Sequence, residues 1–415
     1  MTALRKNGRE IHVGYSTNVH RSESLANVAA FLDGTSVEVR RRVLPGGGRL
    51  GLDLRLGAAL VRELTADLAR VPELAADLDA RGLYVFGVNG FPLGDFQAAV
   101  VKDDAYRPDW SEPARLEATE AMGEILARLL PEDGEGAVST VAGGYRPCGD
   151  DATKRDAMAA AMVRAATAFA RLREETGRTV ALAPEPEPDT TMDDAQSVRR
   201  FYRDHLRPAA RRLGPRADEI LHRHLPVCLD ACHLSVGFEE PAATIAALEA
   251  DGIRVGKANI SCCPTVRDPA RNPAGRRFLT ALDEPRFLHQ TRGRDAGGRV
   301  RLRLADLGAF RELGAEELAD LAEIRSHFHV PLFGLVGHGF ATTRDETAAF
   351  LAALLERSDA AAMGLAVETY TWHVFAHTPL GRTVGSDLVQ GLTREIGWTL
   401  ETVERLGWTR AATGA

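Results

Sequence analysis

Glu185 and Glu187 stand two residues apart in a proline-rich segment that follows a short apolar run. Residues 180–183 are Val, Ala, Leu and Ala, as in a fully buried parallel strand. Prolines at every second position of 184–188 cannot donate to a central sheet ladder, so the strand is predicted to end near Ala183. They also favour extended geometry, which puts both carboxylates on one side of a stiff segment. Glu187 is expected to be exposed or to support its neighbour, and a solvated linker is the alternative for the whole segment.

Further acidic, imidazole and amide side chains stand where other predicted strands end. They are Asp230 and His233, Lys257 and Asn259, His327 and His329, and Glu368 with His373 and His377 beyond it. In a (β/α)₈ barrel these strand ends meet at one face, which carries the chemistry. Carboxylates gathered there without a counter-ion repel one another, and a divalent metal removes that cost. Mixed carboxylate and imidazole ligands suit Mn²⁺, Co²⁺, Zn²⁺ or Fe²⁺ better than Ca²⁺, so we expect a divalent metal cofactor.

The elements that must position these residues alternate between strand and helix. Strands are predicted near residues 11–19, 50–56, 82–90, 136–142, 179–183, 227–233, 253–261, 326–333 and 363–372. With helical patterns between most of them, they predict an α/β fold of the (β/α)₈ TIM-barrel type. Because nine strands are predicted and a (β/α)₈ barrel has eight, either residues 326–333 or an earlier segment must lie outside the ring. A doubly wound sheet is the alternative, but no Gly-x-Gly-x-x-Gly follows the first strand to support its dinucleotide-binding version.

The region after the seventh strand is expected to decorate the barrel. Residues 262–285 are irregular and rich in Pro, Arg and Asn, and residues 287–292 and 300–304 resemble a hairpin. Residues 387–406 are predicted to close the chain as a helix. We therefore expect a single decorated barrel domain over residues 1–415, with an insertion at about 262–325.

The composition of the 415-residue chain excludes several classes of protein. A net charge of −7 without basic stripes argues against a nucleic-acid partner. No apolar run approaches the roughly 18 residues of a membrane span, and the polar N-terminus lacks the core of a secretion signal. Five cysteines without a Cys-x-x-Cys pair indicate free thiols in a reducing cytoplasm. We expect a cytoplasmic protein without membrane insertion that acts on a small molecule; the oligomeric state is left open.

The strand-end motifs resemble those of the xylose isomerase-like barrel superfamily of sugar isomerases and epimerases. The motifs are Glu185-Pro-Glu, Asp230-Ala-Cys-His233 and Val367-Glu368. More narrowly, nearly the whole chain resembles the EboE family, called metabolite traffic proteins, which suggests a role in secondary metabolism. This resemblance rests on residues 15–20 (YSTNVH), 83–92 (LYVFGVNGFP), 102–110 (KDDAYRPDW), 184–188 (PEPEP), 328–333 (FHVPLF) and 367–372 (VETYTW). The family name reflects gene neighbourhood more than known chemistry.

The superfamily resemblance implies a metal held by a Glu, an Asp, a His and a Glu on the last four strands. Glu185, Asp230 and Glu368 match the first, second and fourth positions. At the third position Asn259 stands where a His is usual, and an amide holds a transition metal poorly. His329 is the expected replacement, so the predicted ligands are these three acidic residues and His329.

The resemblance also indicates residues that contact the substrate. His233 occupies a position that contacts substrate in the superfamily. Asn89 and His20 end earlier strands and are expected, with Asn259, to line the pocket. His289 is the second choice for the missing imidazole ligand and otherwise a candidate to bind substrate.

The implied activity is that of a metal-dependent isomerase or epimerase of a small polyol, sugar or cyclitol. In epimerases of the superfamily, one metal-bound glutamate takes a proton from the carbon beside a carbonyl and a second returns it on the opposite face. Here the pair would be Glu185 and Glu368. Lys257 is a candidate to stabilise a developing oxyanion, and a structural ion pair is its alternative.

Three other functions remain open. One is a different metal enzyme on the same barrel, such as a hydrolase, a lyase or an iron oxygenase. Another is a metabolite-binding protein without turnover. The third, a nuclease relative with three metals, is disfavoured by the net negative charge.

Overall fold

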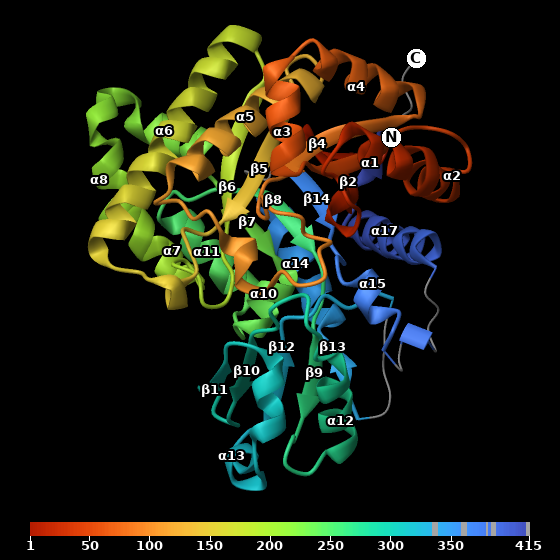
Figure 1. The fold of residues 1–415 in the computed structure, drawn as a ribbon, viewed down its shortest axis with the longest axis vertical. Helices are drawn as coiled ribbons and strands as arrows, with labels where there is room; N and C mark the ends of the chain where they lie inside the picture. Colours follow the sequence, from red (N-terminus) through yellow and green to blue (C-terminus); the bar gives the residue numbers. More distant parts are fainter. Residues whose placement is uncertain (334–338, 358–362, 379–380, 383–386, 412–415) are drawn as a thin grey trace.

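Eight parallel strands in the described part of the chain form a nearly closed barrel with helices outside it (Figure 1). The computed structural model describes residues 1–333, 339–357, 363–378, 381–382 and 387–411. The strands pair in the order β6, β5, β4, β3, β2, β14, β8, β7, and β6 contacts β7 to bring the ring close to closure. They are β2 (Arg9–Ser16), β3 (Leu50–Arg55), β4 (Leu83–Asn89), β5 (Glu135–Val141), β6 (Thr179–Glu185), β7 (Val227–Asp230), β8 (Val255–Ile260) and β14 (Met363–Val367). The predicted TIM-barrel fold is confirmed.

Helices follow the strands in sequence and cover the outside of the ring. They are α1 (Leu25–Phe31), α2 (Val37–Val43), α3 (Ala58–Ala66), α4 (Arg70–Ala80), α5 (Pro113–Leu129), α6 (Ala152–Thr176), α7 (Ala195–Phe201), α8 (Arg207–Ala210), α9 (Ala217–His224), α10 (Ala231–Val236), α11 (Pro241–Ala250), α14 (Arg344–Glu356), α15 (Trp372–Phe375) and α17 (Leu388–Arg405). The predicted C-terminal helix is therefore present as α17. Within the described residues, no helix is both long enough and apolar enough to cross a membrane.

The strand that carries Glu185 runs two residues further than predicted. β6 continues through Pro184 to Glu185, which pair with Thr140 and Val141 of β5. The other neighbour of β6 is β7, and no ladder joins these two strands in the described residues. A proline is tolerated where a strand lacks a ladder on one side, so Pro184 does not end the strand.

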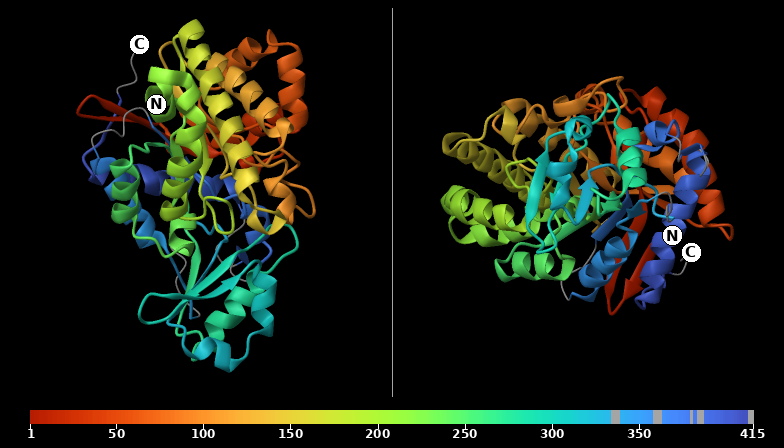
Figure 2. Two further views of the ribbon diagram at one scale, coloured as in Figure 1. Left: turned by 90° about the vertical axis from the view of Figure 1, so that its left-hand side faces the viewer. Right: turned by 90° about the horizontal axis from the view of Figure 1, so that it is seen from below.

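A second, antiparallel sheet extends from the mouth of the barrel (Figures 1 and 2). Its order is β11, β10, β12, β9, β13. The elements are β9 (Pro264–Arg267), α12 (Pro273–Leu282), β10 (Thr291–Arg294), β11 (Val300–Leu304), α13 (Ala315–Ala319), β12 (Glu323–Ser326) and β13 (Ala341–Thr342). β10 and β11 form the predicted hairpin, although β10 begins four residues later than the segment that suggested it.

The prediction of a strand over residues 326–333 is wrong. The strand of this region is β12, which ends at Ser326, and residues 327–333 form no strand, although an isolated bridge joins Val330 to Cys262. Pro331 has no N–H to donate to a ladder. Residues 327–333 are thus the ninth candidate, and they lie outside the barrel ring.

The first and last strands of the described residues pair on the outside of the barrel. β1 (Ala3–Lys6) pairs with β2 and with β15 (Thr409–Arg410), both antiparallel. The chain therefore leaves the barrel beside the point where it enters.

Three glycines on different strands make room for one aromatic ring inside the barrel. A Cβ atom at Gly364 would lie 2.3 Å from Phe86, and one at Gly14 or Gly51 would lie 2.8 or 2.9 Å from the same ring. The Phe86 side chain is buried. Cores are packed closely enough that each added methyl group here would displace the ring or the strand.

We expect Gly364→Ala to lower the free energy of unfolding by about 1–3 kcal/mol, the usual cost of overpacking a core. Urea unfolding of this variant with and without Phe86→Leu measures the coupling between the two positions. The loss of unfolding free energy caused by Gly364→Ala should be smaller in the Phe86→Leu background, where the ring is absent. An equal cost in both backgrounds would show that Phe86 is not the obstacle.

Candidate metal centre

A pocket lies at the carboxyl ends of the barrel strands, between the ring and the segment that follows β12. It holds about 520 Å³ of space not filled by atoms. Its polar lining includes Asn18, Asn89, Tyr106, Glu185, Glu187, His233, His327, His329, Glu368 and Tyr370. Acidic and imidazole groups from four separate segments therefore meet here.

Three carboxylates form the base of this cluster. Glu185 ends β6, Asp230 ends β7, and Glu368 directly follows β14. All three are buried, and a carboxylate oxygen of each lies within 4.8 Å of the other two. Burial, with Asp230 nearby, raises the pKa of Glu185 to about 7, and burial beside Glu185 raises the pKa of Glu368 well above its usual value. These groups are costly to hold together as anions without a cation.

Amide groups hold one oxygen of each glutamate. Asn259 Nδ2 donates to Glu185 Oε1 at 2.8 Å. Asn18 and Asn89 donate through Nδ2 to Glu368 Oε1 at 2.7 and 2.8 Å. Among the described residues, every hydrogen bond to these two carboxylates falls on Oε1, so Oε2 of each is free for a ligand.

One carboxylate oxygen of Asp230 accepts hydrogen bonds and the other has no hydrogen-bond partner. Its Oδ1 accepts hydrogen bonds from Ser261 Oγ at 2.7 Å and from the His233 backbone N–H at 3.0 Å, which also caps α10. Its Oδ2 is buried and has no hydrogen-bond partner in the described part of the chain. A buried carboxylate oxygen without a partner is unfavourable, and a divalent cation is the partner that this acidic surrounding favours.

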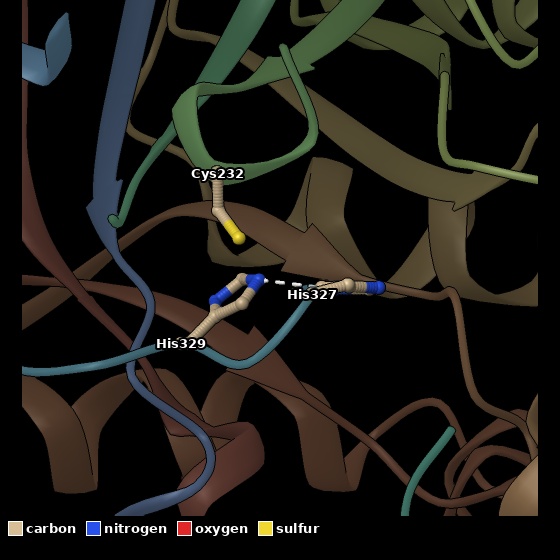
Figure 3. Close-up of side chains that lie close together, drawn as sticks. All are labelled: Cys232, His327 and His329. Atoms are coloured by element: carbon tan, nitrogen blue, oxygen red, sulfur yellow. Dashed lines mark hydrogen bonds between the residues drawn. The ribbon is translucent and has the colours of Figure 1, made fainter. Parts of the chain in front are cut away.

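Three imidazoles complete the cluster. His233 lies in the first turn of α10, and His327 and His329 follow β12. His327 Nε2 lies 3.1 Å from His233 Nε2 and 3.3 Å from His329 Nε2. Figure 3 shows the second of these contacts, with the Cys232 side chain directed toward the same pair of rings. Burial lowers the pKa of His329 to about 4 and that of His327 well below its usual value, so both rings are neutral at neutral pH.

The predicted ligands are brought together. The ligand atoms of Asp230, His233 and His329 lie within 4.8 Å of one another, as do those of Glu185, Asp230 and Glu368. His329 Nε2 is 4.0 Å from Asp230 Oδ1. Its Nδ1 faces the backbone carbonyl of Glu368, which fixes the ring beside that strand end. His329 thus stands next to the acidic group where the seventh strand offers only Asn259.

Lys257 is not among the residues that line the pocket. Its Nζ forms a 2.7 Å ion pair with Asp53 Oδ2 and donates to Ser139 Oγ at 2.8 Å inside the barrel. Burial opposes the charge, but the Asp53 carboxylate raises the pKa of Lys257 above its usual value. The geometry is that of the structural ion pair, the alternative considered for this residue.

Two predicted histidines also lie outside the pocket lining. His20 is buried, stacks on Phe31 with ring centroids 4.7 Å apart, and faces the hydroxyl of Tyr15. His289 uses Nε2 on Glu284 and Nδ1 on the backbone carbonyl of His327. Both of its ring nitrogens are engaged, so it supports the segment that carries His327.

Glu187 and His327 were not chosen from the sequence. Glu187 is buried rather than exposed, and its Oε1 accepts a 2.6 Å hydrogen bond from the Tyr106 hydroxyl. It also lies 3.3 Å from His327 Nδ1. The signal for His327 was the His-Phe-His spacing, which puts two imidazoles on one side of an extended segment.

We expect Asp53→Ala to lower the free energy of unfolding by about 3–5 kcal/mol, because the Lys257 ammonium would stay buried without a counter-charge. Asp53→Leu combined with Lys257→Met should recover most of that loss in denaturant unfolding. Glu174→Ala, which removes an exposed ion pair with Arg216, is the control and should cost less than about 1 kcal/mol. If Asp53→Ala and Glu174→Ala lowered the free energy of unfolding by similar amounts, the buried ion pair would not matter more than the exposed one.

We expect a divalent cation to raise the melting temperature, because it would pair with Asp230 Oδ2 and relieve the repulsion around it. At about 100 times the dissociation constant, the gain is about 2.7 kcal/mol. Thermal unfolding with Mn²⁺ or Zn²⁺ and with a chelator measures the shift. Asp230→Asn, which can still cap α10, should lose it, whereas the exposed Asp67→Asn should keep it. An undiminished shift in Asp230→Asn would place the cation elsewhere.

Comparison with known proteins identifies the fold. No protein-family model and no curated protein matches the sequence. A xylose isomerase-like TIM barrel protein from Mycobacterium smegmatis, in complex with magnesium, aligns over 95% of this chain and 97% of its own, at 12% identity and a TM-score of 0.50. A protein from Anabaena variabilis, provisionally named as a sugar phosphate isomerase/epimerase, aligns over 95% of this chain and 99% of its own. Its identity is also 12% and its TM-score is also 0.50.

A third structure is longer than the chain. It is a fusion of a xylose isomerase-like TIM barrel with a 4-hydroxyphenylpyruvate dioxygenase, and the match covers 95% of this chain but 42% of the fusion protein, at 13% identity and a TM-score of 0.42. From the first two structures, the chain has the fold of the xylose isomerase-like TIM barrels.

Proposed function

We propose that this chain is a metal-dependent isomerase or epimerase of a small polyol, a sugar or a cyclitol. The observation that carries the proposal is the convergence of Glu185 and Glu368 on one pocket, each with Oε1 held by amide donors and Oε2 free. Two carboxylates so placed suit proton transfer at a carbon beside a carbonyl. The provisional naming of the Anabaena variabilis neighbour as a sugar phosphate isomerase/epimerase is consistent with this proposal.

The cation would be held by Glu185, Asp230, His329 and Glu368. The unpartnered Asp230 Oδ2 and the mixed oxygen and nitrogen ligands fit Mn²⁺, Co²⁺, Zn²⁺ or Fe²⁺. When bound, the cation polarises the substrate carbonyl and stabilises the charge that develops there, an effect worth several kcal/mol.

The two glutamates would share the proton transfer. One takes the proton from the carbon beside the carbonyl, and the other returns a proton to that carbon from the opposite face. The three amides that donate to Oε1 keep both carboxylates in place. Lys257 takes no part, because its ammonium is engaged by Asp53 away from the pocket lining.

The rest of the pocket favours an uncharged substrate with one apolar face. Phe96, Phe287 and Tyr370 pack against one another on its wall, with ring centroids 4.9–5.2 Å apart. Lys102 is the one Lys or Arg among the described lining residues, and Asp306 pairs with its Nζ at 2.6 Å. A phosphate group would find no free cationic side chain there, whereas a polyol would find hydroxyl partners and an aromatic surface.

Membership of the EboE family, with its link to secondary metabolism, belongs to the same proposal. Each stretch that carries the resemblance supplies a residue to the pocket, among them Asn18, Asn89, Tyr106, His329 and Tyr370. We also propose that residues 1–415 act as one decorated domain with an insertion at about 262–325, in the cytoplasm.

Solvent exchange tests the proposed reaction. We expect the Mn²⁺-loaded protein in D₂O to exchange the hydrogen beside the carbonyl of a ketose or keto-cyclitol, observed by NMR. Glu185→Gln and Glu368→Gln should each slow the exchange by about 10²–10⁴, because each removes a proton-transfer group. Glu175→Gln, an exposed glutamate on α6, is the matched control and should leave the rate unchanged.

Three results would contradict this proposal. Full exchange in both glutamine variants would remove the paired-glutamate mechanism. Calorimetric binding of a polyol without exchange of any hydrogen would favour a binding protein, and oxygen consumption with bound iron would favour an oxygenase.

A further inference from the structure

The C-terminal helix carries a buried carboxylate that the proposed reaction does not use. Glu395 lies on α17, and its side chain is completely buried. No residue of α17 is among the described residues that line the pocket. An acidic side chain is rarely buried without partners, so the contacts of this carboxylate indicate its role.

Three hydrogen bonds reach this carboxylate from two segments that carry ligands of the proposed cation. The Leu332 N–H and the Thr369 hydroxyl donate to Oε1 at 3.1 and 2.6 Å, and Trp372 Nε1 donates to Oε2 at 3.0 Å. Leu332 follows His329 by three residues, and Thr369 directly follows Glu368. One side chain outside the pocket lining therefore fastens both segments.

The same two segments are also bonded to each other. Thr371 Oγ1 donates to the backbone carbonyl of His329, whose ring nitrogen Nδ1 faces the backbone carbonyl of Glu368. Both segments lie outside the strands, because residues 327–333 form no strand and β14 ends at Val367. Backbone that lies outside a strand ladder depends on contacts of this kind to satisfy and hold its polar groups.

Two neighbours of Glu395 on α17 adapt the helix to these segments. Gly391 lies four residues before Glu395 and therefore on the same face of the helix. A Cβ atom at Gly391 would lie 2.2 Å from the Trp372 ring, so the glycine lets the indole approach the helix. Glycine inside a helix costs about 0.5–1 kcal/mol relative to alanine, and this close approach accounts for it. The Arg394 guanidinium lies over the Phe333 ring, 3.7 Å from its centroid.

We propose that Glu395 is a positioning residue, which holds the segments of residues 327–333 and 368–375 at the separation that the cation site requires. His329 comes from outside the barrel ring, so its distance from Glu368 is set by contacts between these segments rather than by the sheet. Glu395 acts through its three donors and touches neither cation nor substrate. The effect on cation binding rests on the proposed function, whereas the fastening of the two segments does not.

Titration of the full chain with Mn²⁺, followed by electron paramagnetic resonance, tests this role without an assay of activity. In Glu395→Gln, either orientation of the amide turns its N–H groups toward the Leu332 N–H or the Trp372 indole N–H. We expect the dissociation constant for Mn²⁺ to rise about tenfold, as when outer partners of metal ligands are removed. Circular dichroism verifies that the variant is folded at the temperature of the titration.

Thr402→Val is the matched control for this titration. Thr402 is also buried on α17, and its hydroxyl donates to a backbone carbonyl of the same helix. This variant removes a buried hydrogen bond from α17 without touching either segment. The dissociation constant for Mn²⁺ should therefore stay unchanged, whatever the loss of unfolding free energy.

Hydrogen–deuterium exchange of the metal-free chain, read by mass spectrometry, tests the fastening itself. In Glu395→Gln, peptides covering residues 327–333 and 368–375 should exchange faster than in the unaltered protein, whereas peptides of the barrel strands should not. Thr369→Val removes a single donor, so it should give the same change to a smaller extent. It also keeps the test decisive if Glu395→Gln does not fold.

The possible failures are distinguishable. Unchanged Mn²⁺ affinity in Glu395→Gln, in a protein whose cation is lost in Asp230→Asn, overturns the positioning role. An equal loss of affinity in Thr402→Val also overturns it, because the effect would then be one of stability. If the unaltered protein binds no cation, the proposed function fails and the exchange data decide. Faster exchange confined to the two segments then supports the fastening, and unchanged exchange overturns it.

Discussion

Mutual repulsion among buried carboxylates is the constraint on which the mouth of this barrel depends. Glu185, Asp230 and Glu368 come from strands far apart in the chain, and the ring brings their oxygens within 4.8 Å. Burial removes the water that would screen them, so the pKa of Glu185 rises to about 7 and that of Glu368 rises well above its usual value. An arrangement of this kind persists in a fold only if something offsets the repulsion, and a cation is the direct way to do so.

The surrounding side chains divide the work of positioning from that of binding. Amides occupy one oxygen of each glutamate, and carbonyl oxygens occupy one nitrogen of each imidazole. The carboxylate oxygens without a hydrogen-bond partner in the described residues are Oδ2 of Asp230 and Oε2 of Glu185 and Glu368. For the proposed cation, these hydrogen bonds would leave the ligand atoms in place before binding, which would reduce the reorganisation that binding requires.

Charge deeper in the barrel is balanced separately. Lys257 lies two residues before Asn259 on β8, so its side chain stands one layer further from the mouth, where Asp53 pairs with it. Phe86 fills space left by glycines on three strands. The Lys257–Asp53 pair and the Phe86 ring fill the barrel interior beneath the acidic cluster, and the Lys257 charge opposes part of the rise in the pKa of Glu185 and Glu368.

The sequence by itself determined the features that depend on neighbouring residues. Apolar runs and their spacing predicted the alternation of strands and helices, and hence the barrel, and they placed Glu185, Asp230 and Glu368 at strand ends. The sequence pattern around Pro184 did not reveal that this residue continues a strand. A proline is tolerated there because β6 has no ladder with β7, and strand pairing is set by the tertiary structure. Side-chain direction and partner choice were decided only by the tertiary structure. The acid that pairs with Lys257 lies 204 residues away, and two of the three imidazoles, His327 and His329, come from a segment outside the ring. These contacts follow from packing between distant elements, which short-range periodicity does not encode.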